Sequence, residues 1–420
     1  MKLSRFGQRF ARRTGARDLM DDLGAAMAGS SDMKMLGGGN PAHIPEIQTL
    51  MSERLREVAG SERELKRMLS NYPSPAGEEH FRAALAALLS REYGWNLGPE
   101  NIALTGGSQG SFFLLFNLLA GELSSGGKQK ILLPLTPEYI GYEDLGVSED
   151  MLTSRKPEIE YLDNRIFKYR VDFTGMESLE DLGAICVSRP TNPTGNVLTD
   201  NEVSHLSELA LHHDVPLIID NAYGAPFPQI IFSDTQPIWD EHIILCMSLS
   251  KIGLPGARTG IVVANKDIID ALTSMNAVLS LAVGSVGPVM MQALVESGEI
   301  LKLSREVIRP YYERKALQSV DWFHEVLDGL DYQIHKPEGA LFLWLWFKGL
   351  PVSSEELYQR LKDRGVLVIA GQHFFPGLDE DWPHTRECIR VTYSQDDQMV
   401  REGIAIIADE VKRIFAEFGA

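Results

Sequence analysis

Six short apolar runs, separated by longer amphipathic segments, constrain the fold of this chain more than any other feature. Their apolar residues are consecutive rather than alternating, which is the pattern of strands that are covered on both faces. Helical spacing of apolar residues fills the segments between them, and this rhythm favours a mostly parallel α/β sheet. The six expected strands cover residues 102–104, 131–133, 184–187, 216–219, 243–247 and 260–263.

Two of the expected helices carry clear boundary signals. Residues 79–92 place apolar side chains on one face, and Gly94 follows them directly. A second helix is expected to begin after Thr199, because Thr199 and Glu202 have the spacing of a capping box.

The last hundred residues have a different pattern, with a strand expected at 341–346 and a closing helix at 400–418. We therefore predict a large α/β domain over residues 50–310, with a mostly parallel mixed sheet flanked by helices. A smaller α+β domain is expected to combine residues 1–49 with residues 311–420.

Charge and cysteine usage exclude several classes of partner. The 420 residues carry a net charge of −18 at pH 7, which repels nucleic acid and anionic lipid, so we expect neither as a partner. No apolar run reaches the roughly 18 residues of a membrane span, and the N-terminus lacks the apolar core of a secretory signal. Cys186, Cys246 and Cys388 are far apart and odd in number, so we expect reduced thiols and a cytoplasmic location.

The residues that follow the strands are the first candidates for a site, because ligands of parallel α/β sheets bind beyond the strands' carboxyl ends. Residues 105–110 (TGGSQG) lie between a strand and a helix expected from about Ser111. Small residues let backbone amides approach a ligand, and a helix N-terminus suits a phosphate. The string matches neither the P-loop nor the dinucleotide fingerprint, and a purely structural turn is the alternative.

Three further strings follow strands in the same way. Residues 134–139 end in Tyr139, whose ring could stack on an aromatic ligand or simply pack in a loop. Residues 188–195 hold Asn192 between two prolines, as a positioned donor or as part of a rigid turn. Asp220 ends an apolar strand, where a carboxylate is costly unless it is paired, and Tyr223 follows three residues later. A helix cap is the alternative for Asp220.

Lys251 is the most informative residue of the chain. It follows the apolar run 243–247, lies among small residues, and is followed by a Gly/Pro turn and by Arg258. A lysine in this position is not expected to be a free surface side chain.

These five strings, in this order, resemble the fold-type I pyridoxal-phosphate-dependent aminotransferases, and within them the valine–pyruvate aminotransferases. The resemblance extends over nearly the whole chain. It is carried by residues 36–41, 134–142, 188–197, 220–228, 246–260, 335–347 and 382–394.

The resemblance implies a covalent site for pyridoxal phosphate. Lys251 would form the Schiff base with the cofactor and then carry a proton, which requires a neutral amine and hence a depressed pKa. Asp220 would pair with the pyridine nitrogen and keep the ring an electron sink. Asn192 and Tyr223 would bond the phenolic oxygen, and Tyr139 would stack on the ring.

The same resemblance assigns the phosphate and the substrate carboxylate. The phosphate would contact Gly107, Ser108, Ser248 and Arg258, and Gln109 would also bind the cofactor. The α-carboxylate of the substrate would bind Arg390, with contacts from Gly39 and Asn192, because a forked guanidinium suits a carboxylate. Arg386 lies four residues earlier and is the competing candidate, but the apolar neighbours of Arg390 favour Arg390.

The implied reaction is ping-pong transfer of an amino group from L-valine to pyruvate, giving 3-methyl-2-oxobutanoate and L-alanine. Tyr72 matches a tyrosine that reaches the phosphate in the neighbouring subunit, so a homodimer is expected. The ten histidines show no metal-ligand spacing, and no metal is expected.

Two alternatives stay open. One is a different reaction on the same scaffold, such as another aminotransferase specificity for small or aromatic amino acids or a C–S or β-lyase. The other is a cofactor-sensing transcription regulator. Such a regulator needs a DNA-binding module, for which the chain has no room before Leu36.

Overall fold

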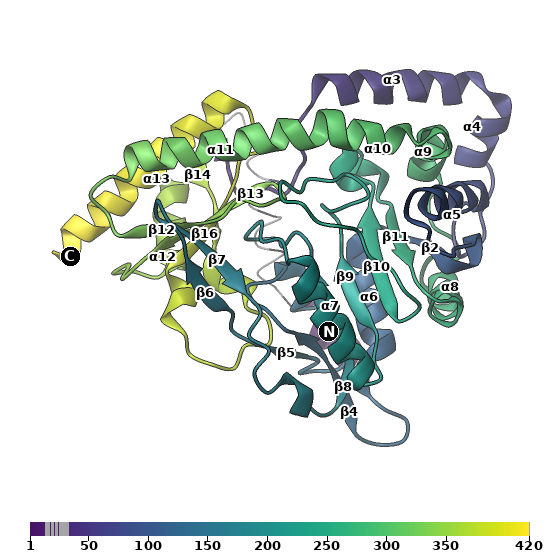
Figure 1. Ribbon diagram of the computed structural model, residues 1–420, viewed down its shortest axis with the longest axis horizontal. Helices are drawn as coiled ribbons and strands as arrows, with labels where there is room; N and C mark the ends of the chain where they lie inside the picture. Colours follow the sequence, from purple (N-terminus) through teal and green to yellow (C-terminus); the bar gives the residue numbers. More distant parts are fainter. Residues whose placement is uncertain (13–16, 18–20, 22–23, 25–32, 420) are drawn as a thin grey trace.

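The computed structural model describes residues 1–12, 17, 21, 24 and 33–419, and two sheets dominate them (Figure 1). The larger sheet has the order β2-β11-β10-β9-β8-β4-β3, with β5 beside β4. Its strands are β2 (Ile102–Thr105), β3 (Gly121–Glu122), β4 (Lys128–Leu133), β5 (Leu152–Ser154), β8 (Leu182–Ser188), β9 (Leu217–Asp220), β10 (Ile243–Ser248) and β11 (Gly260–Val263). All six strands expected from the apolar runs are therefore present.

The larger sheet is mixed but mostly parallel, as predicted. Strands β4, β8, β9 and β10 run parallel to one another, whereas β11 is antiparallel to both β10 and β2. Register pairs Asp220 with Ser188 on one side and with Cys246 on the other. The ends of neighbouring strands therefore lie level at one edge of the sheet.

Helices cover both faces of this sheet (Figure 1). Alternate residues of a strand point to opposite faces, and in β9 Leu217 and Ile219 pack in the same core cluster as α7 (Asp200–His212), whereas Ile218 packs with α6 (Ser108–Leu119). The other helices around this part of the chain are α3 (Pro45–Gly60), α4 (Glu62–Leu69), α5 (Glu79–Tyr93), α8 (Lys266–Ser280), α9 (Val286–Ser297) and α10 (Glu299–Leu303).

Two predicted helix boundaries are confirmed and one is wrong. Helix α5 ends at Gly94, whose φ of 72° is left-handed, and the Thr199–Glu202 capping box begins α7. Helix α6 begins at Ser108 and not near Ser111, because Gly107 with φ 94° completes the turn after β2 and leaves Ser108 as the first helical residue.

The second sheet has the order β15-β16-β13-β12-β7-β6. Its strands are β6 (Glu158–Tyr161), β7 (Ile166–Arg170), β12 (Tyr332–His335), β13 (Phe342–Phe347), β15 (Ile369–Ala370) and β16 (Cys388–Thr392), and a separate pair joins β1 (Lys34–Met35) to β14 (Val366–Leu367). Helices α11 (Arg309–Val326), α12 (Ser354–Asp363) and α13 (Asp397–Phe418) accompany this part of the chain, and α1 (Arg5–Phe10) lies near the N-terminus.

The expected strand at 341–346 is present one residue later as β13, and the closing helix begins three residues earlier than expected, because Asp396 caps α13. Strands β6 and β7 lie in the second sheet although their residues fall within the range 50–310. Part of the range 1–49 lies outside the described residues. The division into domains stays a prediction.

Two further expectations concern the core and the membrane. All three cysteines are buried and free, as expected. Within the described ranges, no helix combines the length and the apolar character that crossing a bilayer requires.

A buried ion pair ties the two sheets together. Lys168 of β7 contacts Glu338, which lies just before β13, and both side chains are almost completely buried. The Lys168 ammonium also donates to Asn196 Oδ1 at 3.1 Å and to the Val197 carbonyl at 2.9 Å. The backbone amide of Val197 donates to Glu338 at 3.2 Å. The pair therefore joins the second sheet to the loop that follows β8.

We predict that breaking this pair on one side destabilises the protein more than replacing both partners. Glu338→Leu alone leaves the buried Lys168 ammonium without its carboxylate and should cost about 3–5 kcal/mol, whereas adding Lys168→Met should recover most of that loss. Lys168→Met alone should cost less, because Lys336 still pairs with Glu338 at 2.9 Å. Urea unfolding followed by circular dichroism measures the unfolding midpoints, and a Glu338→Leu protein as stable as the double variant would contradict the expectation.

Candidate active site

The site lies at the edge where the parallel strands of the larger sheet end. Asp220 ends β9 and Ser248 ends β10, and the segments after them carry Tyr223 and Lys251. Strand β11 is antiparallel, so its beginning lies at this same edge, with Gly260 opposite Ser248. Arg258, two residues before β11, therefore lies near the carboxyl end of the neighbouring strand β10.

A cavity of about 130 Å³ lies among these segments. Its lining includes nine of the residues predicted from the sequence, namely Ser108, Gln109, Tyr139, Asn192, Asp220, Tyr223, Ser248, Lys251 and Arg258. Ser188, Pro190, Ala222 and Ser250 also line it and were not predicted as site residues.

Lys251 occupies a short 3₁₀ turn, Ser250–Ile252, after β10. Its ammonium donates to the Gly39 carbonyl at 2.7 Å and lies 5.1 Å from the centre of the Tyr223 ring. Burial lowers the pKa of Lys251 to about 8, and the positive charges of Arg390 and Arg258 act in the same direction. The depressed pKa expected for this lysine is therefore confirmed.

Asp220 is held by two hydrogen bonds. Its Oδ2 accepts from the Tyr142 hydroxyl at 2.8 Å, and its Oδ1 accepts from the Ala222 amide at 3.0 Å. Burial raises the pKa of Asp220 to about 6, although both hydrogen bonds and the charge of Lys251 act to lower it. The carboxylate is thus poised to pair with a positive group in the cavity.

The opposite part of the cavity suits an anion. Ser108 and Gln109 lie in the first turn of α6, where backbone N–H groups have no partner within the helix. Arg258 lies directly against Gly107, because a Cβ at Gly107 would be only 2.2 Å from its Nη2. The Gln109 amide donates to the Gly141 carbonyl at 3.0 Å, and its buried Oε1 has no partner among the described residues.

Arg390 of β16 lies beside this cavity and is buried. Its two Nη atoms donate to Asn192 Oδ1 at 2.5 Å and to the Gly37 carbonyl at 2.7 Å, whereas its Nε has no partner among the described residues. Arg386, the competing candidate, is exposed and pairs with Asp381. The burial expected from the apolar neighbours of Arg390 is therefore confirmed.

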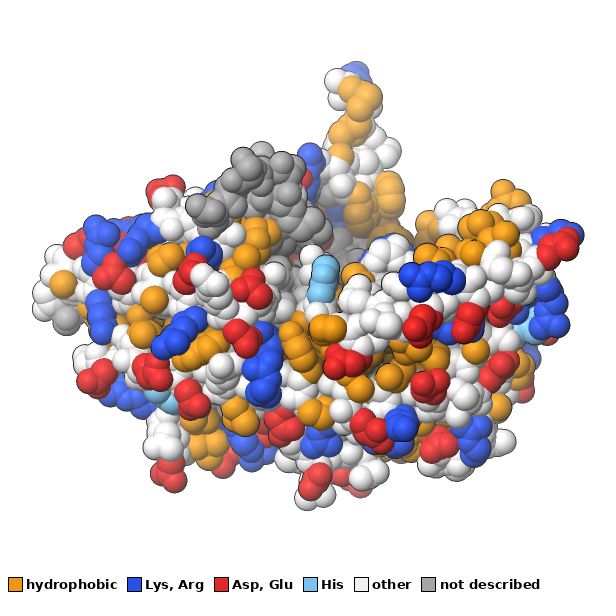
Figure 2. All heavy atoms as spheres, turned by 90° about the horizontal axis from the view of Figure 1, so that it is seen from above, with side chains coloured by type: hydrophobic (Ala, Val, Ile, Leu, Met, Phe, Trp, Pro, Cys, Tyr) orange, Lys and Arg blue, Asp and Glu red, His pale blue; other side chains and the backbone are white. Residues whose placement is uncertain are grey.

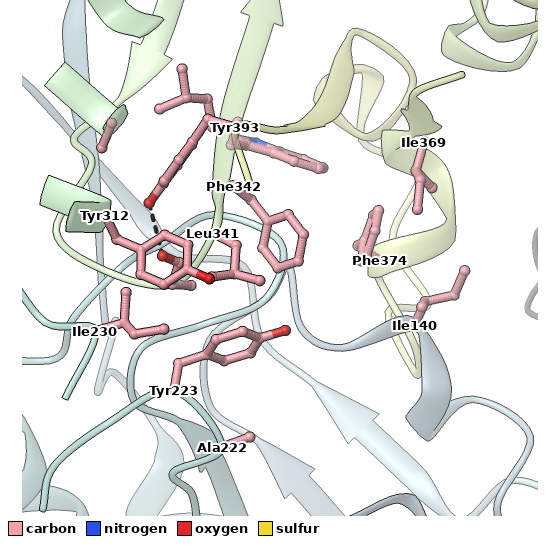
Figure 3. Close-up of a cluster of buried hydrophobic side chains, with 14 of the residues drawn as sticks. Ile140, Ala222, Tyr223, Ile230, Tyr312, Leu341, Phe342, Ile369, Phe374 and Tyr393 are labelled. Atoms are coloured by element: carbon pink, nitrogen blue, oxygen red, sulfur yellow. Dashed lines mark hydrogen bonds between the residues drawn. The ribbon is translucent and has the colours of Figure 1, made fainter. Parts of the chain in front are cut away.

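Aromatic and aliphatic side chains surround Arg390. Its guanidinium lies 4.0 Å from the centre of the Phe342 ring and 5.2 Å from that of Phe374. Figure 3 shows Phe342, Phe374, Ile140 and Tyr223 facing one another, with the Tyr223 hydroxyl directed towards this group. The guanidinium is thus set against an apolar wall.

Two predicted residues have a different setting from the rest. The Gly39 carbonyl contacts Lys251 rather than Arg390. Tyr72 lies in the loop between α4 and α5, is 84% exposed, and does not line the cavity of its own chain.

Sequence reasoning missed the residues behind Asp220. Tyr142 donates to Asp220, and the buried Glu138 accepts from the Ser188 amide at 2.8 Å and lies 2.6 Å from the Ser188 hydroxyl. Glu138 lies five residues after the end of buried strand β4, and a costly carboxylate beyond an apolar strand is the signal that had identified Asp220. That signal could have identified Glu138 as well.

The arrangement fits pyridoxal phosphate. An acid faces the cavity where a ring nitrogen would need a negative partner, and a helix N-terminus with Arg258 provides an anion site. Lys251 lines the same cavity and provides an amine with a depressed pKa. Among the residues that the structure describes, no cluster of His, Cys, Asp or Glu could hold a metal ion.

We predict that the amine of Lys251 in the cofactor-free protein reacts as a neutral group above about pH 8. Because its pKa is depressed, acylation should rise with pH around that value, below the range near 10.4 typical of exposed lysines. Arg390→Met removes one nearby positive charge and should move the midpoint upwards. Competitive acylation read by mass spectrometry measures this, and a midpoint equal to that of surface lysines would contradict it.

Comparison with known proteins identifies the family. The family model for aminotransferase class I and II matches residues 46–407. The chain is 49% identical to the valine–pyruvate aminotransferase of Escherichia coli K12, over 99% of this chain and 100% of that protein. The crystal structure of valine-pyruvate aminotransferase from Salmonella typhimurium LT2 has 49% identity and a TM-score of 0.88, over 96% of this chain and 100% of that one.

A putative amino-acid aminotransferase from Psychrobacter arcticum superposes with a TM-score of 0.96 at 46% identity, over 99% of both chains. The match of the family model covers both sheets and every strand end that lines the cavity. The chain therefore belongs to the class I and II aminotransferases, enzymes that use pyridoxal phosphate.

Proposed function

We propose that this enzyme transfers the amino group between L-valine and pyruvate, giving 3-methyl-2-oxobutanoate and L-alanine. One observation carries the proposal: the buried guanidinium of Arg390 lies against the rings of Phe342 and Phe374, beside Lys251. A fork-shaped cation suits an α-carboxylate, and an apolar wall suits an aliphatic side chain. The name of the 49% identical Escherichia coli relative supports this substrate pair.

The cofactor would be held along the strand ends. Arg258, the Ser248 hydroxyl and the amides at Gly107 and Ser108 would bind its phosphate, with Gln109 beside them. Bound pyridoxal phosphate supplies an electron sink for the electron pair left when the substrate Cα loses a proton.

Four side chains would act on the cofactor ring. The Asp220 carboxylate would pair with the ring nitrogen, and the Tyr142 hydroxyl and Ala222 amide support its orientation. Asn192 and Tyr223 would hydrogen-bond the phenolic oxygen. The Asn192 carbonyl oxygen already accepts from Arg390, which leaves its NH₂ group as the available donor. Tyr139 would stack on the ring.

Lys251 would carry the proton of the reaction. Its Nζ would take the proton from the substrate Cα and deliver it to the C4′ carbon of the cofactor, which requires the neutral amine. Burial and the charges of Arg390 and Arg258 favour that neutral form. Arg390 thus has two effects, because the cation proposed for the substrate carboxylate also lowers the pKa of the proton carrier.

The substrate would be held by its carboxylate and by its side chain. Arg390, assisted by Asn192 and the Gly39 backbone, binds the carboxylate. Tyr139 and residues 340–342 would form the wall of a small apolar pocket, and Phe374, whose ring centre lies 5.2 Å from the Arg390 guanidinium, would extend that wall.

We expect L-valine to bleach the visible absorbance band of the holoenzyme and pyruvate to restore it, because each substrate completes one half of the exchange. Lys251→Ala should abolish both changes. Absorbance spectra and chromatography of the products measure this. Robust exchange with aspartate but none with valine would contradict the substrate pair, and pyruvate or carbon dioxide formed without an acceptor would indicate the lyase alternative.

We further propose that the active unit is a homodimer. Tyr72 is exposed in the single chain, and Val278, Leu279 and Leu281 expose large apolar side chains at the end of α8. The Asn276 side chain joins this end of α8 to the Tyr72 loop by donating to the Pro75 carbonyl at 3.1 Å. Exposed apolar groups gathered in one place are typical of an interface.

A hollow of about 490 Å³ connects this apolar surface to the cofactor site. Gly106, Gln109, Asn276 and Leu279 are among the residues that line it, and Gln109 also lines the cavity of the site. A second subunit covering α8 would therefore bring its own Tyr72 close to the proposed phosphate site.

We predict that Val278→Glu dissociates the dimer and lowers cofactor affinity. Val278 is 87% exposed in the single chain, so a charge there should not disturb the fold of one subunit but would be buried in the interface. Leu211→Glu, at a 58% exposed position near the end of α7, is the matched control. Sedimentation velocity measures the assembly, and a Val278→Glu protein that stays dimeric would contradict the proposed surface.

A cytoplasmic location without nucleic-acid or membrane partners completes the proposal. The buried free cysteines and the net charge of −18 support it. On the face that Figure 2 shows, acidic and basic side chains are interspersed rather than gathered into a basic surface.

A further inference from the structure

Glu138 is a buried carboxyl group that the proposed reaction does not use. It lies in the loop after β4 and is 1% exposed. Its Oε1 accepts from the Ser188 amide at 2.8 Å, and its Oε2 lies 2.6 Å from the Ser188 hydroxyl and 3.2 Å from the Tyr139 amide. No basic side chain among the described residues forms an ion pair with it, and a buried charge without such a partner is costly.

A chain of polar contacts leads from Glu138 to Asp220. The Ser188 hydroxyl lies 3.5 Å from the Tyr142 hydroxyl, and Tyr142 donates to Asp220 Oδ2 at 2.8 Å. The four residues come from the loop after β4 and from the ends of β8 and β9. Two carboxyl groups are thus joined by two hydroxyl groups inside the protein.

The two carboxyl groups are not equivalent. Burial, together with the charge of Asp220, raises the pKa of Glu138 to about 8, although hydrogen bonds to Ser188 and the Tyr139 amide act to lower it. The pKa of Asp220 is about 6, and Lys251 favours its charged form. The other titratable groups that interact with Glu138 are Tyr142 and Cys186, whose pKa values burial raises well above their ordinary range. At neutral pH the negative charge therefore resides on Asp220.

The protonation state of Glu138 determines which group is the donor and which is the acceptor at each of these hydrogen bonds. A neutral Glu138 donates to the Ser188 hydroxyl, which can then turn its own hydrogen towards Tyr142. Tyr142 donates in turn to Asp220. An ionised Glu138 would instead draw the Ser188 hydrogen to itself and leave Tyr142 without that support.

We propose that Glu138 is a positioning residue for Asp220: as a neutral acid, it begins a one-way chain of hydrogen bonds through Ser188 and Tyr142. The chain holds the Asp220 carboxylate ionised and directed at the ring nitrogen of pyridoxal phosphate. This inference rests on the proposed placement of Asp220 at that nitrogen.

Substitutions of Glu138 test whether its side chain acts as a neutral hydrogen-bond donor or as an anion. In Glu138→Gln, the amide group can still donate to Ser188 and its carbonyl can still accept from the Ser188 backbone. Glu138→Met fills a similar volume but removes both interactions. Tyr142→Phe breaks the last link, and Tyr393→Phe is its matched control, because Tyr393 is equally buried and donates one 2.8 Å bond to the Ala340 carbonyl.

Two readouts follow the effect on Asp220 without relying on turnover. The first is the dissociation constant for pyridoxal phosphate in fluorescence titrations of the cofactor-free protein. The second is the pH midpoint of the absorbance change of the bound cofactor. That midpoint should rise when the ring nitrogen is less often protonated, because the ring then no longer disfavours a second positive charge beside it.

We expect Glu138→Gln and Tyr393→Phe to stay within about twofold of the parent protein in the dissociation constant. Glu138→Met and Tyr142→Phe should weaken cofactor binding about tenfold or more, the size of one hydrogen bond to a charged group, and should raise the pH midpoint. Should Glu138→Met fail to fold, Ser188→Ala interrupts the same chain and replaces it in the comparison.

Three outcomes would overturn the proposal. Glu138→Met, or Ser188→Ala in its place, could match the parent protein while Tyr142→Phe is impaired, and Glu138 would then only fill space. Glu138→Gln could be as impaired as Glu138→Met, and Glu138 would then act as an anion. Asp220→Asn could leave both readouts unchanged, and the placement of Asp220 in the proposed function would then fail, a result distinct from the other two.

Discussion

The common edge at which neighbouring parallel strands end is the constraint on which the rest of the structure depends. Hydrogen-bonded register sets Asp220 level with Ser188, and the reversal of β11 adds Arg258 from the opposite chain direction. A shift of one residue in β9 would turn Asp220 to the other face of the sheet. Residues that are far apart in the sequence therefore meet in one site because the register of the strands positions them.

Burial and neighbouring charges together determine the charge state of Lys251. Burial lowers its pKa most, the positive charges of Arg390 and Arg258 lower it further, and Asp220 opposes them. A depressed pKa is the property that a proton carrier near neutral pH requires. The burial and the positive neighbours that disfavour the charged form of Lys251 thus also make its amine suitable for proton transfer.

Local sequence patterns were sufficient for six strands of the larger sheet, for β13 and for most of the residues that line the cavity. Continuous apolar runs predict buried strands, and the polar residue after each run predicts the site edge, as Asp220 and Lys251 illustrate. The network behind Asp220 was not predictable, because Glu138 and Tyr142, which follow β4, meet Ser188 at the end of β8 only when the two strands lie side by side. The pairing of β7 with β12 joins residues more than 150 positions apart, and no local pattern encodes it. The role proposed for Tyr72 requires a second chain.

The Lys168–Glu338 pair has a mechanical consequence. Lys168 belongs to the second sheet, yet it is bonded to Asn196 and Val197 in the loop that also carries Asn192. Arg390 belongs to the same second sheet and donates a hydrogen bond to Asn192 Oδ1. If that sheet were displaced, the loop would therefore move with it, and Arg390 and Asn192 would keep their positions relative to each other. The two residues proposed to hold the substrate carboxylate would therefore keep their mutual hydrogen bond during such a displacement.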